Sequence, residues 1–155
     1  MTRSAAVASS AARAIPAAAL ARYCPKSVAG GTDTVSFALR GHGNVGAQIL
    51  DHRPSELCVS AITVAELRYG TSRRKSSRLD QLVDNFIGNI AVMPFDEACA
   101  DNFGRIASAL TEKGTPIGDL DALIAAHAMT LGVTLVTNNV KHFRRVPGLK
   151  VVNWF

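Results

Sequence analysis

Two aspartates separated by a single residue open the most apolar helical stretch of this sequence. They are Asp119 and Asp121; the following residues as far as Leu131 carry no charged side chain, and Gly132 supplies a stop signal. We therefore expect a helix buried nearly all round, with both carboxylates at its exposed N-terminal end. The helix dipole stabilises ionised carboxylates there, and fixed carboxylate oxygens suit a hard divalent cation such as Mg²⁺ or Mn²⁺.

The same two residues also fit an ordinary structural role. Asp119 can be the N-cap of the helix, and Asp121 can be a first-turn acid that complements the helix dipole. Taken alone, this fragment leaves the structural and the functional interpretation both open.

Helical and strand patterns alternate from Thr32 to the C-terminus. Apolar runs predict strands over residues 57–60, 91–93, 133–136 and 150–154. Helical periodicity predicts helices over 34–39, 45–50, 62–69, 79–87 and 96–110, besides the helix that follows Asp121. Strands separated by helical lengths indicate an α/β domain with a mainly parallel sheet and helices on both faces. In that architecture, sites gather outside the carboxyl ends of the strands.

A third carboxylate, Glu66, lies one turn into the helix that follows the predicted strand 57–60. A carboxylate there points from the start of a helix towards the strand ends. The structural alternative is an intrahelical partner for Arg68 or Arg73, but spacings of two and seven residues are poor helical spacings for an ion pair. We therefore interpret Glu66 as a candidate functional acid.

Asp33 is a fourth acid, at the opening of the first predicted helix. It is either an N-cap beside Thr32 or Thr34, or a member of the same acidic site. Two histidines also lie near the acids in the sequence. His127, on the apolar helix, is interpreted as a packed histidine, whereas His142 is a weak candidate for a pocket residue.

The composition is that of one globular domain with an atypical N-terminal segment. The chain has 155 residues, of which 48% are hydrophobic and 19% charged. Residues 1–30 are rich in Ala and Ser, basic and free of acids, so we expect a poorly ordered extension before a domain over residues 31–155. Arg13 and Pro16 interrupt any secretory signal, and a transit peptide is only weakly supported.

Cysteines and hydropathy indicate where such a chain works. The three cysteines have neither paired metal spacing nor an even count, which favours a reduced, cytoplasmic compartment. No stretch approaches the roughly 18 apolar residues of a membrane span.

Positive charge is clustered in two stretches of the domain. One holds Arg68, Arg73, Arg74, Lys75 and Arg78, and the other holds Lys141, Arg144, Arg145 and Lys150. Solvated helix faces commonly carry such clusters, but clusters of this kind also contact phosphates. Arg68 is our candidate for a contact with a phosphate-containing substrate.

Segments along most of the chain resemble one known family. They are TDTVSFALR (32–40), SAITVAELRYG (60–70), IGDLDALIAAHA (117–128) with LVTNN (135–139), and HFRRVPGL (142–149) with VNW (152–154). Their combination resembles the VapC toxins, the PIN-domain ribonucleases of bacterial toxin–antitoxin pairs. The resemblance covers residues 32–155.

The resemblance implies a compact α/β/α PIN fold, an acidic pocket that binds Mg²⁺ or Mn²⁺, and endonucleolytic cleavage of RNA. Glu66 and Asp121 match the family's second and third acidic positions, and Asp119 is expected to be a supporting ligand. Asn138 and Asn139 follow the next strand, where related proteins often place another acid. Their amides are expected to bind water or substrate.

The sequence departs from the family at the first acidic position. Members usually begin with an apolar strand that ends in an acid, but the alignment places Gly31 there. The residues just upstream, 23–31, are expected to make a poor central strand because they include Pro25 and paired glycines. We hypothesise that Asp33, two residues further along, substitutes as a metal ligand.

Two functions therefore remain open. The first is a metal-dependent endoribonuclease toxin, and the second is a catalytically impaired PIN domain that binds an antitoxin or RNA. In either case the resemblance implies a VapB-type antitoxin as partner, bound in a groove near the acids, and a homodimer. Helices over residues 62–69 and 79–87 are expected to supply such surfaces.

Overall fold

A five-stranded parallel sheet forms the centre of the domain. The structure, a computed structural model, describes residues 28–41 and 43–155, so most of the expected extension (1–27) lies outside the described residues. The strands are β1 (Val28–Gly30), β2 (Leu57–Ser60), β3 (Ala91–Met93), β4 (Thr134–Val136) and β5 (Val151–Val152), in the order β3-β2-β1-β4-β5. All four pairings are parallel. The expected α/β class is confirmed.

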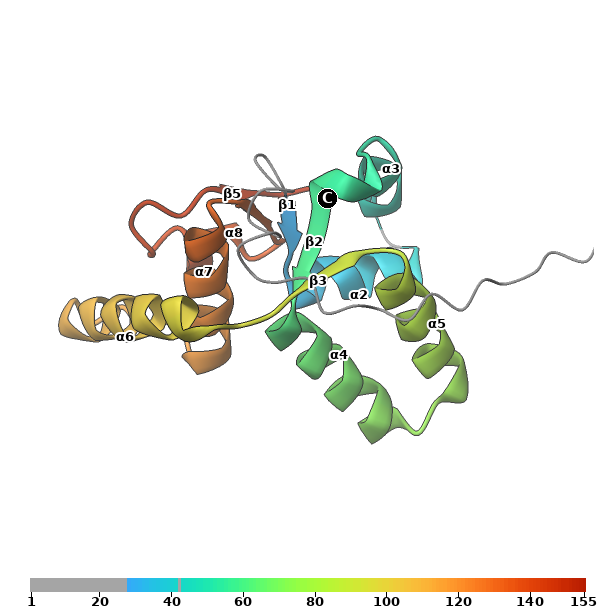
Figure 1. Cartoon of the computed structure of the whole chain (residues 1–155), viewed down its shortest axis with the longest axis horizontal. Coiled ribbons are helices and arrows are strands. Elements are labelled where there is room, and N and C mark those ends of the chain that lie inside the picture. Colours follow the sequence, from blue (N-terminus) through green and yellow to red (C-terminus); the bar gives the residue numbers. More distant parts are fainter. Residues whose placement is uncertain (1–27, 42) are drawn as a thin grey trace, which may run out of the picture.

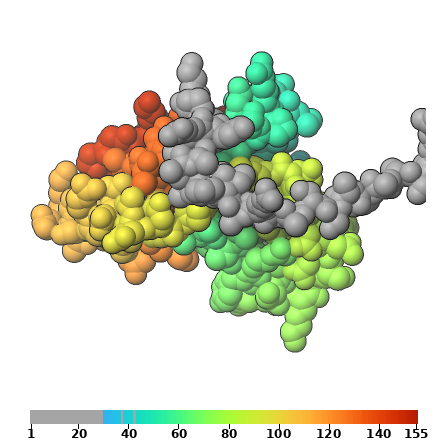
Figure 2. Space-filling view, in the orientation of Figure 1, coloured from blue at the N-terminus to red at the C-terminus, as the bar shows by residue number. Residues whose placement is uncertain are grey.

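Helices lie on both sides of this sheet, as Figure 1 shows. Figure 2 shows α6 (yellow) and the α4–α5 pair (green) extending in different directions from the centre. No helix in the described part of the chain is long and apolar enough to cross a membrane. The helical segments are α2 (Thr32–Arg40), α3 (Val45–Leu50), the 3-10 turn η1 (Pro54–Glu56), α4 (Ala61–Arg74), α5 (Ser77–Gly88), α6 (Glu97–Glu112), α7 (Asp119–Leu131) and α8 (Val140–Phe143).

Strand β2 supplies a side chain to each of two apolar cores. Successive side chains of a strand point to opposite faces of the sheet. Accordingly, Cys58 belongs to the cluster formed with α6 and α7, where Leu110 and Ala125 are buried. Its neighbour Val59 belongs to the cluster formed with α2, α4 and α5, where Leu67 and Val83 are buried. The sheet is thus covered on both faces.

Helix ends follow signals that the sequence carries. The Ser60 hydroxyl accepts a hydrogen bond from the Ile62 N–H (3.0 Å) and caps α4, and Asp96 accepts one from the Cys99 N–H (3.0 Å) and caps α6. Gly132 ends α7 with a left-handed conformation, at φ +67°. The predicted stop signal at Gly132 is confirmed.

The expectation of a poor central strand is wrong. Strand β1 lies between β2 and β4, and it reaches three residues into the segment assigned to the extension. Pairing on both sides offsets the low strand propensity of its glycine. Gly30 also has a packing role, because a Cβ built there would lie 3.2 Å from the Val35 side chain of α2. The absence of a side chain therefore lets α2 pack close to the strand.

The C-terminal elements also differ from expectation. The final strand is two residues long instead of covering 150–154, and the short helix α8 before it was not predicted. Backbone pairing with β4 accounts for β5, since Leu135 N–H donates to the Lys150 carbonyl (2.8 Å) and Thr137 N–H to the Val152 carbonyl (3.0 Å). Trp154 then leaves the sheet and stacks on His52, with ring centroids 4.9 Å apart.

Ser60→Ala is expected to destabilise the protein more than Asp96→Ala. Ser60 is both a cap and the partner of buried His127, whose Nδ1 lies 2.8 Å from the Ser60 hydroxyl. Losing a cap costs about 1 kcal/mol, and a buried polar group left without a partner costs roughly 1–3 kcal/mol more. Urea unfolding of both variants measures the difference. Equal losses would show that the His127 contact adds nothing to the cap.

Candidate active site

A pocket of roughly 200 Å³ opens beyond the carboxyl ends of β1, β2 and β4. This is the edge at which parallel α/β sheets bind their ligands. Ile124 and Phe143 form part of its apolar wall. Its polar wall is made of Thr32, Asp33, Glu66, Asp121, Thr137 and Asn139. The structure thus brings together Glu66, Asp121, Asp33 and Asn139, which the sequence predicts as candidate site residues.

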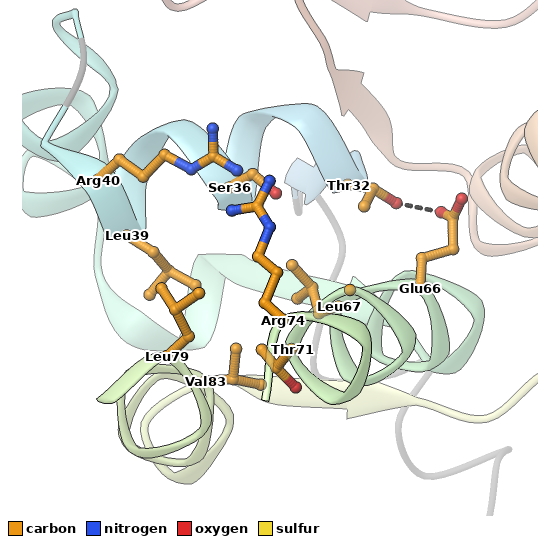
Figure 3. A pocket seen from close by; sticks show the side chains of 11 residues that line it. Thr32, Ser36, Leu39, Arg40, Glu66, Leu67, Thr71, Arg74, Leu79 and Val83 are labelled. Atoms are coloured by element: carbon orange, nitrogen blue, oxygen red, sulfur yellow. Dashed lines mark hydrogen bonds between the residues drawn. The ribbon is translucent and has the colours of Figure 1, made fainter. Parts of the chain in front are cut away.

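Glu66 reaches this pocket from the second turn of α4. The Thr32 hydroxyl, at the start of α2, donates a short hydrogen bond to Glu66 Oε2. This contact crosses between two helices that follow adjacent strands, and Figure 3 shows the two side chains pointing toward each other. The alternative of an intrahelical ion pair is wrong, because Arg68 lies 2.5 Å from Asp84 of α5 and Arg73 lies over the Tyr69 ring.

Asp121 is held by His142, for which the sequence alone gives only weak evidence of a role in the pocket. His142 Nε2 lies 2.9 Å from Asp121 Oδ2 and 2.6 Å from the Ile117 carbonyl oxygen. Because both partners are acceptors, Nε2 carries the proton that is shared between them. Helix α8, which positions His142, therefore fixes the start of α7. The sequence around residue 142 does not predict this contact, because the short helix α8 was not expected there.

Burial and charge act together on Asp121. Partial burial raises the pKa of its carboxyl, and the nearby Asp33 charge raises it further, whereas His142 lowers it. Asp121 and Asp33 are therefore close enough to repel each other when both are ionised. Ionising both carboxylates in this pocket costs free energy, and the hydrogen bond from His142 offsets part of that cost.

Asp33 connects the start of α2 to the end of β4. Its Oδ1 accepts from the Thr34 N–H (2.7 Å). Its Oδ2 accepts from the Thr137 hydroxyl (2.9 Å) and the Asn138 N–H (2.8 Å). A ligand role for Asp33, as hypothesised to compensate for Gly31, would require it to bind a cation in addition to these donors. The alternative of an N-cap is wrong, since Asp33 is the second residue of α2.

Three other expected site residues lie outside the pocket lining. Asp119 is exposed as the first residue of α7, and its N-cap alternative is wrong because Gly118 holds that position. Asn138 contributes its backbone N–H to Asp33, while its side-chain oxygen accepts from Asn153 (3.4 Å). Arg68 faces Asp84 of α5. Thr32 and Thr137 line the pocket but carry no distinctive sequence signal.

The residues present can hold a hydrated Mg²⁺ ion but do not form a dense metal cage. Among the described residues, no group of three or more acidic, histidine or cysteine side chains is close enough to hold a metal. However, Glu66 Oε1 and Asp121 Oδ1 have no hydrogen-bond partner in the described chain and line one pocket. Mg²⁺ commonly binds through one or two carboxylates and keeps several waters. Two carboxylates therefore fit a Mg²⁺ ion that keeps most of its water ligands.

Gly31 lines the pocket and contributes neither a side chain nor a charge to it. A Cβ built on it would lie 3.0 Å from Asp33 Oδ1 and 3.2 Å from the Val136 carbonyl oxygen. A side chain there is therefore tight against a neighbouring carboxylate and against backbone. The glycine both removes one expected acid and relieves crowding around Asp33.

Comparison with known proteins agrees with this fold. Residues 35–149 match the PIN domain family. The chain is 33% identical over 124 residues to the tRNA(fMet)-specific endonuclease VapC of Salmonella typhimurium, covering 79% of this chain and 94% of that protein. It is 39% identical over 99 residues to ribonuclease VapC2 of Rickettsia felis, covering 63% and 74% respectively.

Solved structures of VapBC complexes have a similar fold. VapBC2 from Rickettsia felis, bound to a promoter DNA fragment, superposes with a TM-score of 0.76 at 33% identity, covering 83% of this chain and 98% of that one. DNA-bound VapBC from Salmonella typhimurium gives a TM-score of 0.75 at 32% identity, covering 84% and 99%. The chain belongs to the PIN-domain family, within the group of the VapC ribonucleases.

His142→Leu is expected to raise the pKa of Asp121. The substitution fills a similar volume but removes the group that lowers this pKa, so burial and the Asp33 charge act unopposed. The carboxyl then stays protonated to higher pH than in the parent protein. An NMR titration of the Asp121 side chain measures the shift, with Lys141→Leu as a control on the exposed neighbouring position. An unchanged or lower midpoint would contradict the assigned role of His142.

Proposed function

We propose that this protein is the toxin of a VapBC-type pair and cleaves RNA phosphodiester bonds with the help of Mg²⁺ or Mn²⁺. The observation that carries the proposal is the pocket beyond the ends of parallel strands, in which Glu66 and Asp121 each keep one carboxylate oxygen without a partner among residues 28–41 and 43–155. Homologues at 33–39% identity are named as VapC endonucleases or ribonucleases, which supports the reaction class.

In this proposal the carboxylates of Glu66 and Asp121 hold the divalent ion. When bound, such an ion activates water and stabilises charge on a scissile phosphate. Thr32 orients Glu66, and His142 orients Asp121 and favours its ionised form. Asn139 lines the same pocket and offers an amide to the substrate, whereas Asp119 acts only from outside.

The proposed partners follow from the comparisons. Several similar solved structures are VapBC assemblies, so we infer a VapB-type antitoxin as the partner. We also infer a homodimer, as the resemblance to the family implies. Work in the cytoplasm is consistent with Cys99, whose thiol is buried and free within the described part of the chain.

A second candidate function is an RNA- or antitoxin-binding module without cleavage. Gly31 favours it, because the position expected to supply the first acid has no side chain. Asp33 favours it as well, since its oxygens already accept three hydrogen bonds. Metal-dependent cleavage separates the two candidates.

Purified protein is expected to cleave structured RNA in Mn²⁺ or Mg²⁺ and to lose this activity in EDTA. Asp121→Asn should lower the rate by about a hundredfold or more, since charge stabilisation by a bound metal is worth several kcal/mol. Asp119→Asn is the matched comparison, two residues away on α7 but outside the pocket, and should lose much less. Circular dichroism checks that each variant is folded.

No cleavage by a folded sample supplied with metal would overturn the enzyme proposal and favour the binding module. Equal losses in the Asp119 and Asp121 variants would instead contradict the assignment of the metal ligands.

Gly31→Asp is expected to strengthen both metal binding and cleavage by about tenfold or more, because a third carboxylate joins the metal site. The φ of Gly31 is not in the left-handed region, so a side chain is compatible with this backbone conformation, but the Asp33 carboxylate and the Val136 carbonyl both have to shift by a few tenths of an ångström. Mn²⁺ titration calorimetry and the cleavage rate are the measurements.

Gly31→Asn is the matched control, since it introduces nearly the same volume without the charge. A gain in both variants would point to packing rather than to the missing acid. A folded Gly31→Asp protein with unchanged metal affinity would show that this position does not limit the site.

A further inference from the structure

A second pocket, of roughly 240 Å³, lies next to the acidic one and has a different character. It runs between α2, α4 and α5, and its walls include Leu39, Leu67, Leu79 and Val83. Thr32 and Glu66 line both pockets, so the two are continuous at that end. Its walls include parts of α4 and α5, which the sequence predicts as an antitoxin surface, but the function proposed above gives no role to its charged residues.

Two arginines from different helices reach the far end of the second pocket. Figure 3 shows the guanidinium groups of Arg40, the last residue of α2, and Arg74, the last residue of α4, pointing toward one another over the apolar wall. Both residues are exposed. Neither pairs with a carboxylate within residues 28–41 and 43–155. Two like charges that converge without a counter-charge form a site for an anion.

Helix ends explain part of this arrangement but not all of it. Cations are favoured in the last turn of a helix because they complement the dipole, which accounts for a basic residue at each position. The helix dipole does not explain why both arginine side chains line the same pocket. Arg73, beside Arg74, turns elsewhere, since its guanidinium carbon lies 5.7 Å from the Tyr69 ring centroid.

The arginines stand at a fixed distance from the acids. Arg40 is eight residues after Thr32 on α2, and Arg74 is eight residues after Glu66 on α4. At 1.5 Å per residue, each arginine lies about 12 Å along its helix from the Thr32–Glu66 contact. A single RNA strand covers such a distance in a few nucleotides, so one strand can touch both places.

We propose that Arg40 and Arg74 clamp a backbone phosphate of the RNA strand whose scissile phosphate lies at the acids, with the neighbouring nucleoside packed on the apolar wall. This inference rests on the proposed ribonuclease function. Planar guanidinium groups bind phosphate oxygens in a bidentate manner. The pair therefore sets which part of the strand enters the acidic pocket.

RNA fits this surface better than an acidic peptide does. An acidic peptide is attracted to the arginines and repelled by the acids, so only the arginine end of this surface suits it. An RNA strand already has to approach the acids for cleavage, and its phosphates repeat along the strand. The clamp offsets the repulsion that the acidic end imposes on such a polyanion.

RNA binding without cleavage is the decisive measurement. A short single-stranded 2′-O-methyl RNA, which serves as a non-cleaved probe, is titrated in EDTA by fluorescence anisotropy at several salt concentrations. The double variant Arg40→Ala/Arg74→Ala should bind about tenfold more weakly or worse, and its salt slope should fall by about one, as for a lost phosphate contact. Arg40→Lys/Arg74→Lys, which keeps the charges but not the bidentate geometry, should lie between the two.

The matched control is Arg73→Ala/Arg78→Ala, which removes the same charge from α4 and α5 outside the pocket. An equal loss there would reduce the effect to general electrostatics and overturn the clamp. The clamp also fails if the parent protein binds no RNA, or if the Arg40/Arg74 variants keep RNA binding and lose only antitoxin binding. Because the measurement needs neither metal nor cleavage, a protein that binds through the clamp but does not cleave refutes only the ribonuclease proposal.

Discussion

The pocket depends on one partly buried polar connection, in which the Asp33 carboxylate joins the first turn of α2 to the residues that follow β4. Two further bonds reinforce it, because the Gly31 N–H and the Thr34 hydroxyl both donate to the Val136 carbonyl oxygen, at 2.9 and 2.8 Å. Hydrogen bonds to a charged acceptor are stronger than neutral ones, and losing them in a buried place is costly. They fix the relative position of β1 and β4, and with it the distance between acids that lie far apart in the sequence.

The remaining acids are kept in place by donors from neighbouring elements. Thr32 binds Glu66 across the α2–α4 contact, and His142 binds Asp121 across the α8–α7 contact. Each donor occupies one carboxylate oxygen and leaves the other without a partner in the described chain. This arrangement limits the repulsion among like charges and keeps acceptors available for a ligand. The raised pKa of Asp121 shows that the compensation is incomplete, since burial and the Asp33 charge outweigh His142.

Gly31 affects both the packing and the charge of this pocket. Without a side chain there, Asp33 is free of a Cβ contact at 3.0 Å and retains its hydrogen bonds to the end of β4. The same absence lowers the negative charge of the pocket, which weakens a metal site but also weakens the repulsion of a phosphate backbone. Arg40 and Arg74 line the other end of the adjoining pocket, so the surface has acids at one end and cations at the other.

Local signals in the sequence determined the helix ends and the candidate acids. Gly132 could be assigned because a helix stop depends on neighbouring residues only. Glu66 could be assigned because it follows an apolar strand, and Asp121 because it opens an apolar helix. Tertiary structure alone decided the partners. His142 meets Asp121 because α8 packs against the start of α7, and Arg68 meets Asp84 because α4 and α5 lie side by side. Likewise, the glycine-containing β1 becomes a central strand because β2 and β4 both pair with it. The stabilisation comes from these neighbouring strands, so the strand propensity of residues 28–30 could not predict it.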